Sequence, residues 1–215
     1  MSLSPGKVIL KDGHRLYDRL NTILIIHAAI GVASLVRLGE DVHFSSGDKT
    51  LVECQHAAVH IRVPVYGPLE NSLGGLALTP IEIEFIHKDT WSEIALNARP
   101  SSGGLRLVLT QAISPVFVEF FESIHQWLRD KGKEETWPPT LRFARVVRHA
   151  ISHGFKISYE LKKGKPAPPP VRWHGLTYSV SNQGKKIFGT DIRFGDLVAL
   201  MLEMSDELDV LGCPL

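Results

Sequence analysis

Apolar residues recur at helical spacing along three stretches of the chain, and this period constrains the fold more than any other feature. The stretches cover residues 14–38, 114–129 and 194–210. Apolar positions three or four residues apart fall on one face of an α-helix, which a protein core can cover. The stripes consist of Leu16, Leu20, Ile23, Ile30 and Leu35; of Val116, Phe117, Phe120, Phe121, Ile124, Trp127 and Leu128; and of Leu197, Leu200, Met201, Met204 and Leu208. The sequence therefore predicts a mostly α protein.

The composition is that of one globular domain with a core of its own. Of the 215 residues, 44% are hydrophobic and 22% are charged, and the formal net charge is +1. Ordinary proportions of this kind exclude wholesale disorder and a fibrous architecture. Because the net charge is close to zero, any contact with nucleic acid has to rest on local charge. We expect a single domain over residues 1–215.

Cysteine usage and the distribution of apolar residues predict a cytoplasmic protein with no membrane partner. Cys54 and Cys213 lie far apart, which is neither a disulfide framework nor a zinc site built on four cysteines. The first residues lack the basic region and apolar run of a signal peptide. The most apolar window, residues 23–36, is shorter than a bilayer requires and contains His27, which we interpret as a core residue.

The region around residues 42–100 is the least regular part of the sequence, and we interpret it as a poorly defined insertion. Residues 51–62 are compatible with a helix. Thr79 and Pro80 are suited to the start of another helix, because proline is tolerated at the first helical position after a threonine cap. The alternation of Ile81, Ile83 and Phe85 favours a short strand instead. The pattern leaves both alternatives open.

The segment after residue 160 predicts a surface connection followed by a hairpin. Residues 162–170 combine lysines, a glycine and three consecutive prolines, which neither a helix nor a central strand accommodates. Residues 171–180 and 185–188 flank the turn-like residues 181–184. This arrangement predicts a β-hairpin, with a bulge near Gly175.

The helix predicted between Thr140 and Gly154 carries basic side chains and no acidic one. A guanidinium is always charged and presents a planar fork of donors to phosphate oxygens, whereas an imidazole titrates near neutrality and transfers protons. Together these groups are suited to binding a phosphodiester and acting on it. The side chains in question are Arg142, Arg145, Arg148, His149 and His153.

The motif and its surroundings resemble the HEPN superfamily. Arg148 is followed after four residues by His153 and Gly154, then by a short β excursion at residues 173–178 and by an amphipathic last helix. The resemblance implies a HEPN-like helical bundle with a short β-hairpin before the last helix. It further implies a dimer whose motif helices face each other, and in many members metal-independent cleavage of RNA. At the position where the family most often has a small polar residue, this chain has His149.

RNA cleavage without a metal requires only a base, an acid and a cation, because the 2′-hydroxyl can attack the adjacent phosphorus. We expect His153 to act as the base or acid, His149 to have a second proton-transfer role and Arg148 to stabilise charge. Arg142 and Arg145 are candidates for phosphate binding. A five-residue step separates Arg148 from His153 around an ideal helix, so we expect a site shared between two subunits. No metal or cofactor is expected.

The sequence thus predicts a metal-independent endoribonuclease of the toxin or defence type, with RNA and an antitoxin protein as partners. The alternative is a non-catalytic module for dimerisation or for binding RNA or nucleotides. The pairs His149 with His153 and His56 with His60 also have a helical spacing that suits zinc, although each lacks a third ligand. Trp173 and Tyr178 are compatible with base stacking, but packing is the more common role. We expect Cys54 to be an inert thiol.

Overall fold

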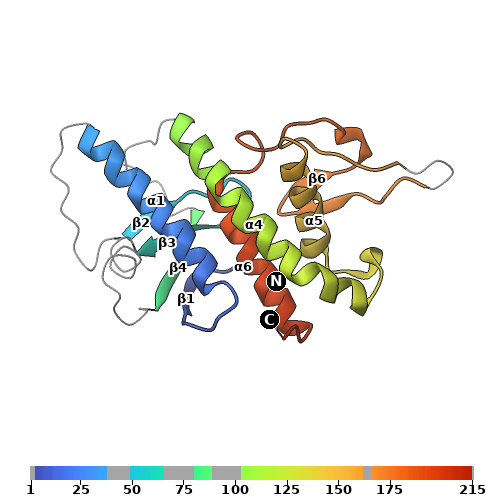
Figure 1. The fold of residues 1–215 in the computed structure, drawn as a ribbon, viewed down its shortest axis with the longest axis horizontal. Coiled ribbons are helices and arrows are strands. Elements are labelled where there is room, and N and C mark those ends of the chain that lie inside the picture. Colours follow the sequence, from blue (N-terminus) through green and yellow to red (C-terminus); the bar gives the residue numbers. More distant parts are fainter. Residues whose placement is uncertain (1–2, 38–48, 65–79, 89–102, 162–165, 215) are drawn as a thin grey trace.

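The protein has an α+β fold, so the prediction of a mostly α helical bundle is wrong. The computed structural model describes residues 3–37, 49–64, 80–88, 103–161 and 166–214 (Figure 1). Within these ranges a four-stranded sheet lies at one end of the molecule and a two-stranded hairpin at the other, with helices between them. The helices are α1 (Tyr17–Arg37), α4 (Gly103–Lys131), α5 (Pro139–Ser152) and α6 (Phe194–Val210). The strands are β1 (Gly6–Leu10), β2 (Lys49–Val52), β3 (Val59–Pro64), β4 (Ile81–His87), β5 (Val171–Trp173) and β6 (Leu176–Tyr178).

The larger sheet occupies much of the region that we interpreted as an irregular insertion. Its strands have the order β1-β4-β3-β2, and every neighbouring pair is antiparallel. In β4 the side chains of Ile81, Ile83 and Phe85 are buried, whereas Glu82 and Glu84 point to the opposite face. This period of two confirms the strand alternative at residues 81–85. The helix over residues 51–62 is wrong, because the β-branched residues there pair as the hairpin of β2 and β3.

The helices agree closely with the predicted stripes. Helix α6 has the predicted bounds, and α1 begins three residues later than predicted, at Tyr17. Helix α4 is longer than the predicted stretch 114–129, and it continues through Pro115, where we expected a helix to start or to kink. Proline lacks the N–H that an inner helical position donates. One turn of this region is held by the hydroxyl of Ser114, which donates to the carbonyl oxygen of Thr110 at 2.7 Å.

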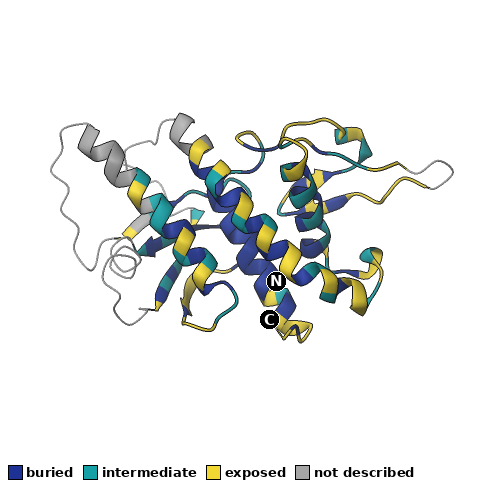
Figure 2. Ribbon diagram, in the orientation of Figure 1, coloured by how far each residue is buried: buried dark blue, intermediate teal, exposed yellow. Residues whose placement is uncertain are grey.

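Helix α6 crosses the middle of the molecule, and most of its residues are buried (Figure 2). Near its start, the carboxylate of Asp196 is fully buried. It accepts hydrogen bonds from the backbone N–H groups of Gln55, His56 and Ala57 in the β2–β3 turn, and from that of Arg193. At Gly195 an added Cβ would lie 2.3 Å from the carbonyl oxygen of Glu53, so the helix and the turn approach too closely for a larger residue. One carboxylate therefore anchors the sheet to the helices.

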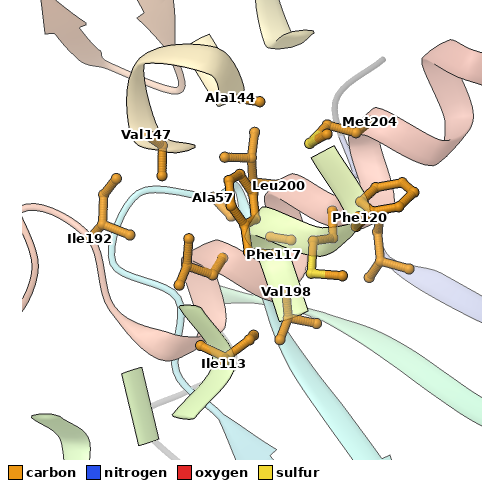
Figure 3. Packing of buried hydrophobic residues seen from close by; sticks show 14 of the residues in the cluster. Ala57, Ile113, Phe117, Phe120, Ala144, Val147, Ile192, Val198, Leu200 and Met204 are labelled. Carbon is orange, nitrogen blue, oxygen red and sulfur yellow. The ribbon is translucent and has the colours of Figure 1, made fainter. Parts of the chain in front are cut away.

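The core continues from the sheet into α4, α5 and α6 (Figure 3). Side chains from α4, α5, α6 and the β2–β3 turn converge there, among them Phe117, Val147, Leu200 and Ala57. His27 on α1 is half-buried and stacks on Phe194 with ring centroids 5.3 Å apart, which places it at the edge of this core. Burial lowers the pKa of His27 below its usual value.

The predicted hairpin exists, but its turn lies elsewhere. Strands β5 and β6 are joined by His174 and Gly175, both at positive φ, as a two-residue hairpin turn requires. Gly175 is therefore a turn residue and not a bulge, and Val180–Asn182 form a 3-10 helix. Residues 185–187 bond to residues 155–157 instead of continuing the hairpin. Trp173 and Tyr178 are buried and both stack on Phe143 of α5, which confirms packing as their role.

Candidate active site

Helix α5 has a buried face and an exposed basic strip. Pro139 occupies the first turn, where its missing N–H costs nothing, so the helix begins one residue before the predicted cap Thr140. Gly154 ends the helix at a φ of 67°, as predicted. Residues that share the inward face are Leu141, Phe143, Ala144, Val146, Val147 and Ala150, and those on the partly exposed strip are Arg142, Arg145, Arg148, His149 and Ser152. All five predicted site residues thus reach the surface, with His153 exposed at the end of the helix.

The two histidines are in contact. Their ring centroids lie 4.2 Å apart, with an angle of 44° between the ring planes. His153 caps the helix, and its backbone N–H donates to the carbonyl oxygens of His149 and Ala150. Burial lowers the pKa of His149, and the positive potential of His153, Arg145 and Arg148 lowers it further. The neutral form of the His149 imidazole is therefore favoured, beside a second imidazole that faces solvent.

Arg148 is held from the neighbouring helix. Its guanidinium forms an ion pair with the carboxylate of Glu122 on α4, and the side chains are 32% and 42% exposed, respectively. On the same helix turn, His125 lies 3.7 Å from Glu122 and packs against the rings of Phe121 and Trp137. Burial lowers the pKa of His125. Arg148 therefore faces α4 from one edge of the basic strip, which fits the wide angle that we expected between it and His153.

The two other arginines differ in their partners. Arg145 forms an ion pair with Glu134, with its nitrogen 2.9 Å from the carboxylate oxygen. Arg142 is half-buried, and its Nε has no hydrogen-bond partner among the described residues. The predicted phosphate-binding pair therefore consists of one guanidinium paired with a carboxylate and one that forms no ion pair among the described residues.

Three side chains of this neighbourhood were not predicted as site residues, namely Glu122, His125 and Tyr159. Tyr159 is half-buried, and burial raises its pKa to about 12. Arg145 and Glu134 lie close enough to act on that pKa as well. The spacing of Glu122 and His125 places both on one face of α4, but only the packing of α4 against α5 shows that this face borders the motif. No local signal marks Tyr159.

The structure removes the helical spacing from one of the two histidine pairs considered for zinc. His56 and His60 do not share a helix face, because they belong to the β2–β3 hairpin, where the Nδ1 of His60 accepts a hydrogen bond from the backbone N–H of Cys54. Within the described ranges, no group of three or more His, Cys, Asp or Glu side chains is arranged to hold a metal ion. The thiol of Cys54 is buried, and burial raises its pKa well above the usual value, as an inert cysteine requires.

Comparison of the chain with protein-family models, curated proteins and solved structures finds no match. In the part of the chain that the structure describes, no helix combines the length and apolar character needed to cross a bilayer.

Proposed function

We propose that the protein is a metal-independent endoribonuclease whose reacting groups lie at the C-terminal end of α5. The observation that carries the proposal is the contact between the imidazoles of His149 and His153 on a strip that also presents Arg148. RNA transesterification needs two proton transfers and one stabilised negative charge. Two adjacent imidazoles in different environments and one guanidinium supply these functions.

The environments of the two histidines suggest their roles. The lowered pKa of His149 favours its neutral form, which is suited to take the proton of the ribose 2′-hydroxyl. The 2′-oxygen then bonds to the adjacent phosphorus, the bond to the 5′-oxygen breaks, and the proton on His153 passes to that leaving oxygen. Arg148 stabilises the charge on the non-bridging oxygens. The products are a 2′,3′-cyclic phosphate and a 5′-hydroxyl.

The same proposal includes a homodimer with a composite cleft. Arg148 faces α4, whereas the contact of His149 and His153 lies at the end of the helix. A two-fold axis beside α5 would let the guanidinium of one subunit approach the histidines of the other. A particle mass that stays monomeric at micromolar concentration removes this part of the proposal. A role as a toxin or in defence, with an antitoxin partner, stays a prediction.

One observation favours the alternative of a non-catalytic RNA-binding module. Arg148 and Arg145 already have carboxylate partners, Glu122 and Glu134, so a phosphate has to displace a carboxylate or use the remaining donors. A guanidinium held in this way is suited to reversible phosphate binding as much as to catalysis. Catalysis and binding are therefore measured separately.

The test is cleavage of single-stranded RNA in the presence of a chelator. His149→Ala and His153→Ala are each expected to lower the rate about 10²–10⁴-fold, since each removes a proton-transfer group. Arg148→Ala is expected to lower it about 10²–10³-fold. His56→Ala and Arg129→Ala replace residues of the same types outside the motif, in the β2–β3 turn and on the surface of α4, and are expected to keep the wild-type rate. Equal rates for all five variants and wild type would favour the binding module.

A further inference from the structure

Just beyond the candidate active site, the backbone places two lysines side by side. Lys156 and Lys186 are the central pair of an antiparallel bridge, and both are exposed. The bridge is closed on one side by the hydrogen bond from Ile157 N–H to the carbonyl oxygen of Lys185, at 2.9 Å. On the other side Ile187 N–H donates to the carbonyl oxygen of Phe155, at 3.1 Å. A pair flanked in this way is a non-hydrogen-bonded pair. Its two side chains lie on the same face, with their Cβ atoms roughly 5 Å apart.

Two like charges directly opposite each other weaken an antiparallel pair. Within the described ranges, neither ammonium group forms an ion pair with a carboxylate. The neighbouring Lys185 differs, since its ammonium lies 2.5 Å from the carboxylate of Asp191. Because side chains alternate along an extended segment, Lys185 points to the opposite face, together with the buried Ile157 and Ile187. Among the described residues, one lysine of this segment is thus neutralised and two adjacent ones have no acidic partner.

The lysine pair is tied rigidly to the end of α5. Gly154 and Phe155, both at positive φ, turn the chain from His153 directly into the bridge. The Cα atoms of His153 and Lys156 are at most about 11 Å apart, because three residues span no more. On the other side, Gly184 N–H donates to Ile157 and the side-chain oxygen of Gln183 accepts from Tyr159 N–H. The backbone at Lys156 and Lys186 therefore has a defined position, close along the chain to the end of α5.

We propose that Lys156 and Lys186 form a subsite for the sugar-phosphate backbone of single-stranded RNA, one or two nucleotides away from the scissile phosphate. An anion between the two ammonium groups removes their mutual repulsion, and an RNA strand bound at His153 has its next phosphates within reach. The inference rests on the proposed function, because it takes the same RNA as ligand. It adds a binding contribution that depends on charge and not on base identity.

The experiment measures binding of a single-stranded RNA that carries 2′-O-methyl groups throughout, so that it lacks the attacking hydroxyl. Dissociation constants are compared between wild type and the double variant Lys156→Gln, Lys186→Gln at salt concentrations from about 50 to 200 mM. Two lost phosphate contacts reduce the slope of log Kd against log salt by about 1.4. A fourfold rise in salt is then expected to weaken RNA binding by the double variant about sevenfold less than it weakens binding by wild type.

The matched control is Lys11→Gln, Lys133→Gln, which removes the same charge at exposed lysines before α1 and in the α4–α5 connection. It is expected to keep the wild-type slope. A double variant with the wild-type slope, or a control that changes equally, overturns the proposed subsite, as does a wild-type protein that does not bind the RNA. If the double variant has the reduced slope but wild type does not cleave unmodified RNA, only the nuclease is refuted. If cleavage depends on His153 but the double variant keeps the wild-type slope, only the subsite is refuted.

Discussion

The sheet end and the α5 end of the molecule arrange their charges in opposite ways. On the outer face of the sheet, the carboxylates of Glu82 and Glu84 are shared among Lys7, Lys49 and Arg62 in one connected network. Around α5, single carboxylates hold Arg145 and Arg148, while Arg142, Lys156 and Lys186 form no ion pair among the described residues. A net charge of +1 for the whole chain conceals this difference.

The comparison separates charges that stabilise the fold from charges left for a ligand. A connected network satisfies its members internally and has little left to offer a phosphate. The α5 end keeps donors and positive potential at the surface, which favours binding of an anion. Substitutions that alter one region are therefore expected to leave the other unchanged.

The largest effect is expected where the two regions meet. Asp196→Ala removes the buried acceptor of four backbone N–H groups, three of them in the β2–β3 turn. Leaving such donors unsatisfied is expected to lower the free energy of unfolding by at least about 3 kcal/mol, measured by urea titration. Asp206→Ala, at an exposed position of the same helix, is the control and is expected to stay within about 0.5 kcal/mol. Equal stabilities of the two variants would mean that Asp196 does not anchor the sheet.

A smaller effect is expected in the sheet network, and it depends on pH. The hydrogen bond from Lys49 holds the pKa of Glu84 at about 2, below its usual 4.5. A lowered pKa adds stability that is fully present above pH 4.5 and is lost as the pH falls towards 2. Glu84→Gln is expected to cost about 1 kcal/mol at pH 7 and to flatten the acid side of the stability curve.

Glu135→Gln, at an exposed glutamate outside the network, serves as the control and is expected to keep the wild-type curve. RNA binding should be the same in both variants, because the network lies away from α5. A change in RNA affinity on Glu84→Gln would break the separation between the two regions.

The smallest effect concerns the ion pair that holds Arg148. Glu122→Gln removes a negative charge that competes with phosphate for the guanidinium. Affinity for uncleavable RNA is therefore expected to increase by up to about fivefold, with little change in the free energy of unfolding. Glu119→Gln provides the same change of charge one turn earlier on α4, where the carboxylate pairs with Arg19. If Glu122→Gln weakens binding instead, the carboxylate positions Arg148 and does not compete with the ligand.

The two regions also differ in how well the sequence predicts them. The stripe of α6 and the glycine that ends α5 allowed their helices to be predicted almost residue by residue, because a helix is specified by neighbours within four residues. The strands of the larger sheet were predicted less well. Strands β2 and β3 are short, and β1 at the N-terminus pairs with β4, which begins only at residue 81, so this pairing left no local signal in the sequence.

The residues of the candidate site also differ in how well the sequence predicts them. Arg148, His149 and His153 could be predicted because one helix carries them all. Glu122 and Tyr159 could not, because α4 and the segment after α5 approach the motif only through tertiary packing. The opposed lysines at 156 and 186 likewise depend on a bridge between segments about thirty residues apart.

The most direct test of the central claim is the chemistry of the ends left on RNA. Mass spectrometry of fragments produced in chelator is expected to show 2′,3′-cyclic phosphate and 5′-hydroxyl ends with the wild-type protein. These products should be absent with His153→Ala prepared in the same way. Fragments with 5′-phosphate and 3′-hydroxyl ends, or identical fragments from the variant, would contradict catalysis by the imidazoles at the end of α5.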